Sequence, residues 1–248
     1  MGEFKLIAQS IRYGNERIDY NVCFVADKRD KVAIHVHPDG SVQVDAPETE
    51  DLVRIKNAVL KRVRWIITHV HQAKKQRESV LPREYISGES YLYLGRRYPL
   101  KIALVNDRKE QKVKLIQGQL RVYTVNPFQP TVKVLLWEWY KDHAKVYFSR
   151  RIKTIVNEVS WIKKEPDWQL LVMQKQWGSC SPKGKLSLNP HLVKAPKECV
   201  EYVIYHEICH LQEHNHSKGF YMLLDTLMPE WKTVKLKLDG MAEVLLNE

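Results

Sequence analysis

The sequence lacks any long hydrophobic run, and this absence bears first on membrane association. No stretch approaches the ~18–20 apolar residues that a membrane-spanning helix needs. The first residues, MGEFKLIAQS, contain no apolar segment of the kind found in signal peptides, and the last residues, MAEVLLNE, are not a lipidation motif. We therefore expect a protein that has no membrane partner and is located in the cytoplasm.

Cysteine is scarce, and the four cysteines form no recognisable framework. Cys23, Cys180, Cys199 and Cys209 are widely spaced and include no CxxC pair. In a cytosolic protein of this size such cysteines are expected to be free thiols. Cys180 and Cys209 lie inside motifs described below, so each is also a candidate metal ligand.

Acidic residues are outnumbered, which bears on the partners of the chain. Lys and Arg total 40 against 29 Asp and Glu, so the net charge is +11. This balance favours a polyanionic partner such as nucleic acid, a nucleotide or an acidic peptide. The basic residues are spread along the chain, however, which is equally typical of a soluble protein with a basic surface.

The first half of the sequence is rich in strand patterns. Residues 20–25 and 31–36 carry alternating or β-branched residues, and Asp39-Gly40 is typical of a hairpin turn. Between about residues 48 and 77, apolar residues recur every three or four positions, which predicts one helix. Its apolar stripe consists of Leu52, Ile55, Val59, Val63, Ile66 and Val70. Residues 85–125 return to three or four short strands, so we assign residues 1–126 to a β-rich N-terminal part.

The second half, residues 127–248, is predicted to be mainly helical. One long helix is expected from about Pro130 to Val159, with a break considered near His143. Two short strands, at 169–173 and 185–189, flank the sequence WGSCS. Further helices are expected at about 195–213, 217–225 and 230–238. The fold class is therefore predicted to be α+β.

An HExxH motif, formed by His206, Glu207 and His210, lies in one of these helices. Helical residues four apart lie on one face, so two imidazoles placed there can bind one metal ion. Glu207 follows the first of these histidines directly. Its carboxylate is thereby placed beside the ion, where a general base for a metal-bound water is needed.

Catalytic zinc usually takes three protein ligands, and the candidates for the third are His214 and His216. In a straight helix His214 would lie about 12 Å along the axis from His206, which ~2.1 Å metal bonds cannot span. We therefore predict that the helix ends or bends after about Gln212. His216 is favoured as the third ligand, because a turn at Asn215 can return it to the ion. His214 would then support the site or face solvent.

Several motifs together resemble the YgjP-like family of zinc metallopeptidases. They are WGSCS (177–181), LN (188–189), AP (195–196), HExCH (206–210), NHS (215–217), Phe220 and an upstream segment, SGESYLYLGRRYPL (87–100). The resemblance covers about residues 20–240. It departs from the family at Gln176, where members often carry Arg, and this puts the substrate specificity in doubt.

This resemblance implies that His206, His210 and His216 bind one zinc ion and that Glu207 is the catalytic carboxylate. It also implies a zincin-like metallopeptidase core and kinship with the SprT-like and WLM metalloproteases, some of which act on DNA-bound proteins. We therefore expect a zinc-dependent hydrolase, most directly a metallopeptidase that cleaves peptide bonds by zinc-activated water with Glu207 as general base. The substrate would be a peptide or protein, which could be associated with nucleic acid.

The surroundings of the zinc site are less defined by sequence. His191, Asn189 and a nearby tyrosine are candidate donors to the oxyanion of the reaction. The strand 185–189 is expected to form a sheet edge that pairs with an extended peptide. WGSCS either supports the zinc helix, with Gly178 allowing a close approach, or contacts substrate.

Two other functions remain open. Some family members are described as UTP pyrophosphatases, and a metal-bound hydroxide can attack phosphorus, although the sequence has no P-loop and no acidic cluster for paired Mg²⁺. Alternatively, the basic β-rich part binds nucleic acid and the zinc site is only structural. Structural zinc sites, however, usually include cysteine ligands.

Overall fold

The computed structural model describes residues 6–14, 16–25, 32–36, 40–78, 82–174 and 176–247. The chain forms two compact units, Met1–Leu81 and Pro82–Glu248. The division therefore lies well before residue 126, where the sequence patterns had placed it. Both units contain helices and sheets, so the predicted α+β class is confirmed.

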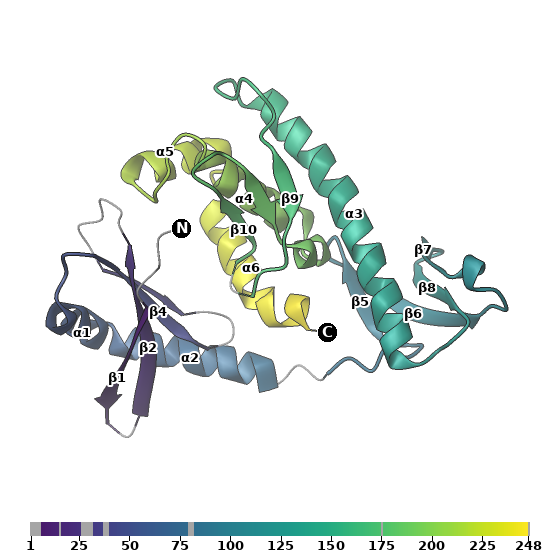
Figure 1. The fold of residues 1–248 in the computed structure, drawn as a ribbon, viewed down its shortest axis with the longest axis horizontal. Coiled ribbons are helices and arrows are strands. Elements are labelled where there is room, and N and C mark those ends of the chain that lie inside the picture. The colour runs from purple at the N-terminus through teal and green to yellow at the C-terminus, as the bar shows by residue number, and fades with distance from the viewer. Residues whose placement is uncertain are drawn as a thin grey trace. The chain divides into compact units, whose positions relative to one another are not determined.

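The N-terminal unit is one four-stranded sheet with two helices (Figure 1). Its elements are β1 (Leu6–Tyr13), β2 (Glu16–Val25), β3 (Ala33–Val36), β4 (Val42–Pro47), α1 (Leu52–Lys61) and α2 (Val63–Glu78). The strand order is β1-β2-β4-β3, in which only the β2–β4 pair is parallel. β3 and β4 pair antiparallel, as the predicted hairpin requires; Asp39 of its turn lies outside the described residues.

The predicted single helix at 48–77 is wrong in one respect, because the structure interrupts it at Arg62. The N–H of Arg62 donates to the carbonyl oxygens of Val59 and Leu60, and α2 begins at the next residue. Asp51 caps the N-terminus of α1 by accepting a hydrogen bond from the N–H of Val53. Four members of the predicted stripe are buried in the core of this unit, namely Ile55, Val59, Val63 and Ile66. Leu52, at the first position of α1, is exposed.

The C-terminal unit contains the remaining elements. They are β5 (Ser90–Tyr93), β6 (Arg96–Leu104), a 3-10 turn η1 (Arg108–Glu110), β7 (Lys112–Ile116), β8 (Gln119–Thr124), α3 (Gln129–Glu158), β9 (Trp168–Leu170), β10 (Gly178–Cys180), β11 (Leu186–Leu188), a 3-10 turn η2 (Pro190–Lys194), α4 (Lys197–Cys209), α5 (Lys218–Leu227) and α6 (Trp231–Leu246). The strands form one four-stranded sheet, β5-β6-β8-β7, and one three-stranded sheet, β10-β11-β9.

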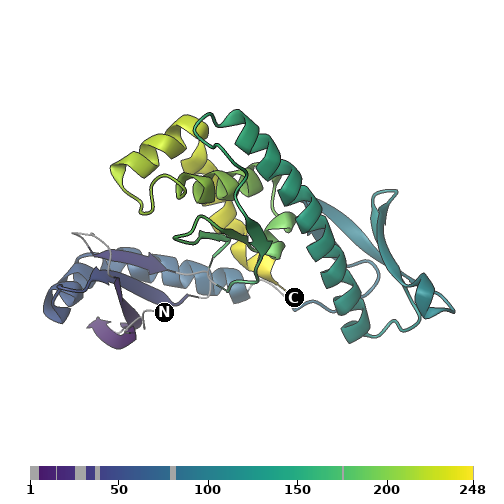
Figure 2. The ribbon, with the colours of Figure 1, turned by 45° about the horizontal axis from the view of Figure 1, so that its top comes forward.

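Helix α3 is the longest element of this unit, and its 30 residues run without a break at His143. It lies between β7 and β8 on one side and α4 to α6 on the other, as Figure 1 and Figure 2 both show. One buried core joins its apolar residues, such as Leu136 and Phe148, to Leu120 of the four-stranded sheet and Ile204 of α4. This shared core explains why residues 90–124 belong with the C-terminal half of the chain.

The three-stranded sheet corrects one expectation from the sequence. The strand predicted at 185–189 forms β11, but β11 is the central strand, with β10 antiparallel on one side and β9 parallel on the other. The strand order brings β9 to it from 18 residues upstream, which no local pattern records. The edge strands of this sheet are β9 and β10. Among the described helices, none is long and apolar enough to cross a membrane.

Candidate metal centre

Helix α4 carries the HExxH motif and is anchored at both ends. Its first turn follows Pro196, whose carbonyl accepts hydrogen bonds from the N–H groups of Cys199 and Val200. The turn at Leu94 and Gly95 packs against this start, because its N–H groups donate to the carbonyls of Val193 and Lys194 at 2.9 and 3.1 Å. The helix that holds the site is thus fixed to the four-stranded sheet as well as to the core.

The helix ends at Cys209, so His210 is its C-cap residue. The N–H groups of Gln212 and Glu213 turn back to the carbonyl of Cys209. The prediction that the helix ends close to Gln212 is therefore confirmed, with the end three residues earlier. The chain then reverses through Asn215, whose carbonyl accepts a hydrogen bond from the N–H of Ser217 at 2.8 Å.

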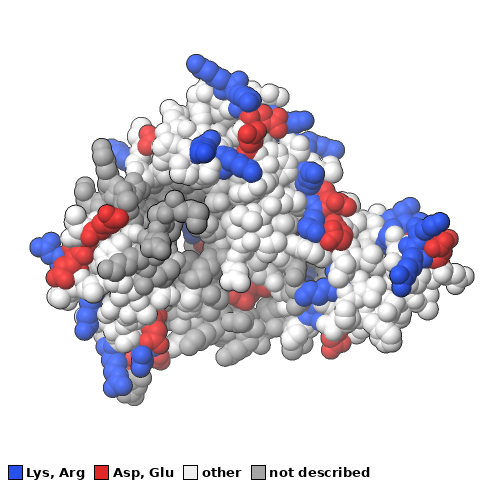
Figure 3. All heavy atoms as spheres, viewed as in Figure 1, with Lys and Arg blue, Asp and Glu red and all other residues white. Residues whose placement is uncertain are grey.

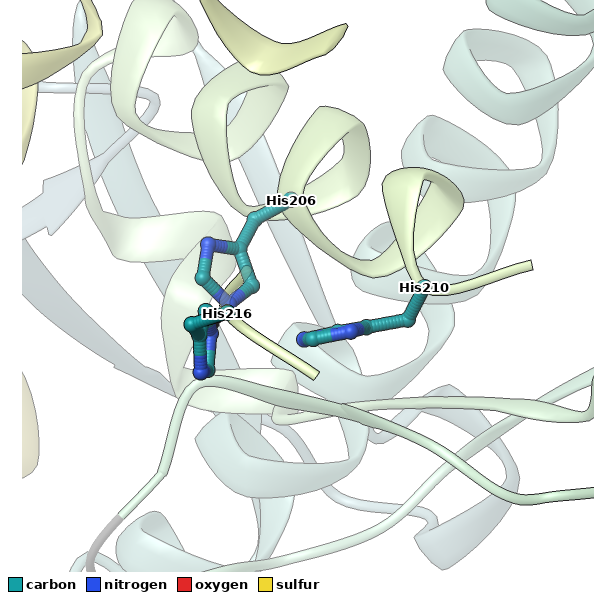
Figure 4. Close-up of side chains that lie close together, drawn as sticks. All are labelled: His206, His210 and His216. Atoms are coloured by element: carbon teal, nitrogen blue, oxygen red, sulfur yellow. Dashed lines mark hydrogen bonds between the residues drawn. The ribbon is translucent and has the colours of Figure 1, made fainter. Parts of the chain in front are cut away.

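Ser217 fixes the far side of this reversal. Its Oγ accepts a hydrogen bond from the N–H of Phe220, which caps α5, and donates to Oε2 of Glu213 at 2.9 Å. Glu213 and Ser217 thereby tie the end of the first helix to the start of the next. His216 lies between these two fixed points, and its side chain is directed back toward α4 (Figure 4).

The three predicted ligands converge. The side-chain nitrogens of His206, His210 and His216 that could bind an ion all lie within 4.8 Å of one another. Figure 4 shows the three rings pointing toward a common point. Nε2 of His206 and Nε2 of His216 are 3.0 Å apart. His214, Cys180 and Cys209 do not belong to this group, which is the one group of its kind that the described residues contain.

Phe220 forms the apolar floor of the histidine group. Its ring centroid lies 4.9, 4.6 and 4.7 Å from those of His206, His210 and His216. The side chain is fully buried. Phe220 was identified from the sequence only as part of a shared motif, and its contact with all three histidine rings was not predicted.

Hydrogen bonding and burial set the protonation of the histidines. Nδ1 of His210 lies 3.0 Å from the carbonyl oxygen of Glu213, which fixes Nδ1 as the protonated nitrogen and leaves Nε2 as an electron-pair donor. Burial, together with the neighbouring histidines, lowers the pKa of His206 to about 3, and burial also lowers the pKa of His210. Both rings are therefore neutral, which is the form that binds metal ions.

Glu207 directly follows His206 in α4 and is 95% buried, its exposed fraction being 5%. Burial raises the pKa of its carboxyl group to about 8. Burial of the thiols, and secondly the charge of Glu207, raises the pKa values of Cys180 and Cys209. A carboxylate in such an apolar setting is a stronger proton acceptor than one in water.

Strand β10 closes against this carboxylate. A Cβ atom added at Gly178 would lie 2.7 Å from both Cγ and Oε1 of Glu207. The absence of a side chain at Gly178 thus leaves room for the side chain of Glu207 where β10 meets α4, in agreement with one of the two interpretations of that motif. The other interpretation, contact with substrate, stays a prediction.

The candidate oxyanion donors differ in burial and in their hydrogen-bond partners. The ring of His191 stacks on Trp137 and its Nδ1 lies 3.0 Å from Nζ of Lys194, while Nδ2 of Asn189 donates to the carbonyls of Met173 and Gln176. Both side chains are buried and engaged in the core. Two tyrosines lie near the histidine group: Tyr202 is buried, whereas Tyr221 is 40% exposed and its ring centroid lies 6.2 Å from that of His216.

The donor set fits one divalent ion. Two nitrogens bound to the same zinc by ~2.1 Å bonds can be at most about 4.2 Å apart. The nitrogens here lie within 4.8 Å of one another, so small rotations of the side chains bring all three to one ion. Nδ1 of His206 is buried and has no hydrogen-bond partner in the described part of the chain. The other ring nitrogen, Nε2, points toward the histidine group and lies 3.0 Å from Nε2 of His216. Three imidazoles, with no fourth protein ligand among the described residues, suit a metal with an open coordination position.

The comparison with protein families agrees with this geometry. The model of the YgjP-like family, described as a metallopeptidase domain, matches residues 30–241. The chain belongs to the YgjP-like metallopeptidase family. Membership shows a metal-dependent peptidase-like hydrolase and favours neither the UTP pyrophosphatase nor the nucleic-acid module with a structural zinc. It implies a metal ion and a peptide or protein substrate for the YgjP-like domain.

Two solved structures show limited similarity to this YgjP-like chain. The metallopeptidase zymogen jannalysin of Methanocaldococcus jannaschii is 29% identical, with a TM-score of 0.31, over 35% of this chain and 92% of its own. The metallopeptidase zymogen abylysin of Pyrococcus abyssi is 19% identical, with a TM-score of 0.31, over 45% of this chain and 97% of its own. No curated protein matched the sequence.

Proposed function

We propose that the protein is a zinc-dependent peptidase in which His206, His210 and His216 hold one zinc ion per chain and Glu207 is the general base. The observation that supports this proposal is the convergence of three imidazoles, whose ligand nitrogens lie within 4.8 Å of one another, with a buried carboxylate, Glu207, next to His206 in α4. The family match supplies the reaction class, and the geometry supports these four residues as its machinery.

The roles of the residues follow from their positions. A zinc ion held by His206, His210 and His216 would lower the pKa of a water ligand to ~7 and polarise the peptide carbonyl. Glu207 accepts the proton of the attacking water and returns it to the leaving nitrogen. The burial that raises the pKa of Glu207 makes both transfers favourable near neutral pH. Phe220 and the hydrogen bond from His210 to Glu213 hold the three rings in place.

The substrate backbone binds along β10 in this proposal. β10 is an edge strand and approaches Glu207 directly, whereas both edges of β11 are occupied. An extended peptide that pairs with β10 would pass the carboxylate and the histidine group. Tyr221, which is exposed and has its ring near that of His216, would donate a hydrogen bond to the oxyanion. The cytoplasmic location expected from the sequence stays a prediction.

The ligand set is tested by a matched pair of variants, His216→Ala and His214→Ala. Purified protein is loaded with zinc, dialysed and analysed for metal content. We expect His216→Ala to lose the ion, because three-ligand binding cannot survive on two imidazoles, and His214→Ala to keep one ion per chain. Equal zinc content in the two variants would show that His216 is not a ligand.

The base is tested by Glu207→Gln, which is close in size and cannot accept the proton. This variant should keep its zinc and lose at least about a hundredfold in peptidase activity on an unfolded protein such as casein. Unchanged turnover with a full zinc content would remove Glu207 from the mechanism.

A further inference from the structure

The four-stranded sheet of the C-terminal unit has one buried face and one polar face. Leu100, Leu120 and Val122 point toward α3 and belong to the core. Side chains alternate along a strand, so the residues next to them point the opposite way. The pairing register places Lys101, Arg121 and Lys114 side by side on β6, β8 and β7.

The next row of this polar face continues the pattern. Ala103, Tyr123 and Lys112 are paired across the same three strands. Nζ of Lys112 lies 5.7 Å from the centroid of the Tyr123 ring. We call the five polar or aromatic residues of the two rows, Lys101, Lys112, Lys114, Arg121 and Tyr123, the cationic sheet face.

No carboxylate neutralises these cations within the described part of the chain. Arg121 donates to the neutral side chains of Gln119 and Gln117, and none of the four basic residues forms an ion pair there. Figure 3 shows Lys and Arg gathered over the region where Figure 1 draws β7 and β8, with few acidic side chains among them.

Repulsion among Lys101, Arg121 and Lys114 lowers the stability of the folded sheet. Adjacent strands are ~4.8 Å apart, so three positive charges stand within about 10 Å across the strands. Like charges directly opposite each other are destabilising, and sheets usually pair them with acids. Three cations without an ion-pair partner on one face would therefore be stabilised by a partner that supplies closely spaced negative charges.

We propose that the cationic sheet face binds single-stranded nucleic acid through its phosphates. A phosphate backbone offers regularly spaced negative charges that match a row of cations. Tyr123 provides a ring on which one base can stack. The cationic sheet face shares no residue with the histidine group or Glu207, so binding there is independent of peptidase activity.

The test compares two triple variants of equal charge. The face variant is Lys101→Gln, Lys114→Gln and Arg121→Gln. The control variant is Lys145→Gln, Arg150→Gln and Lys153→Gln, which removes the same charges from exposed positions of α3. Circular dichroism verifies that both are folded. Binding to a short fluorescein-labelled oligothymidylate is followed by anisotropy between about 50 and 200 mM salt.

The wild type should bind with a steep salt dependence. Each neutralised phosphate contributes ~0.7 to the slope of log affinity against log salt for a single strand, so the face variant should lose about 2 from that slope. Its affinity at low salt should fall about tenfold or more. The control variant should keep the wild-type slope. An equal loss in both variants would overturn the proposal, because it would reflect net charge alone.

Further measurements address the base and the competing polyanions. Tyr123→Ala should weaken binding by about tenfold while Tyr123→Phe keeps it, since stacking needs the ring and not the hydroxyl. The labelled strand should be displaced by unlabelled oligothymidylate or oligouridylate more readily than by duplex DNA, polyglutamate or anionic lipid vesicles. Stronger displacement by any of the last three would assign the face to that partner instead, and no binding by the wild type would end the proposal.

Discussion

Replacing Gly178 with alanine tests the geometry around the proposed base most directly. The added Cβ would lie 2.7 Å from Cγ and Oε1 of Glu207, where ordinary contacts begin at 3.4 Å. The carboxylate must therefore move by about 0.7 Å. The obstructed atoms are the end of a side chain with several rotatable bonds, so the movement should cost little free energy of unfolding, on the order of 1 kcal/mol.

The effect on catalysis should be much larger. A misplacement near 1 Å costs roughly a hundredfold when a reacting group must be held in position. Gly178→Ala should thus lower kcat of the zinc-loaded protein by about ten- to a hundredfold, with the zinc content unchanged. Peptidase assays, metal analysis and urea unfolding measure the three quantities. Gly240→Ala is the control, because its Cβ meets nothing within 4 Å.

A double-mutant cycle separates this cause from a general loosening of β10. Glu207→Asp shortens the side chain by one carbon and withdraws it from position 178. In that background, Gly178→Ala should have almost no further effect on kcat, so the two changes should be strongly non-additive. Additive losses would refute the reasoning, because the alanine would then act on something other than the carboxylate.

Three further predictions concern stability. Zinc at about a hundred times its dissociation constant should add about 2.7 kcal/mol to the free energy of unfolding and raise Tm by roughly 5–10 °C. Scanning fluorimetry should show no such shift in His216→Ala, and a retained shift would indicate another ligand. Gly95→Ala should lower the free energy of unfolding by about 1–3 kcal/mol more than Gly118→Ala, because both glycines have positive φ but only a Cβ at Gly95 would lie 2.8 Å from the backbone of Pro196; equal losses in urea unfolding would disprove the contact. Burial, with a contribution from a nearby lysine, lowers the pKa of His191 from 6.5 to about 3, so the unfolded chain binds a proton in this range that the folded chain does not. Stability should be complete above about pH 6.5 and fall by up to ~1.4 kcal/mol per pH unit as the pH drops toward 3, and His191→Gln should flatten this slope in chemical denaturation; an unchanged slope would contradict the assignment.

The histidine group could be predicted from sequence because its geometry is local. Two positions on one helical turn and a distance that excludes His214 are enough to favour His216, and the structure brings those three rings together. Helix α3 was predictable for the same reason, since thirty residues of continuous helical period leave little ambiguity. The break at Arg62 was not, because the apolar stripe continues across it and one irregular residue leaves the period intact.

Features that depend on distant partners could not be read from the sequence. The pattern at 185–189 indicates a strand but not its neighbours, so the position of β11 at the centre of its sheet was missed. Alternation at 112–124 indicates one buried face but not which helix covers it, which is why the compact units divide elsewhere than expected. The role of Phe220 depends on how α5 folds back onto α4, and this is likewise a property of the tertiary structure.

The shortness of β10 has a consequence for what such a peptidase can cut. The strand has three residues, so it can align only about 10 Å of a partner backbone at ~3.3 Å per residue. A strand this short provides little sequence specificity. It does require the paired segment of the substrate to be extended and outside any helix or sheet of its own. The peptidase would then select substrates by their folding state, and a protein would be cleaved where it is locally unfolded.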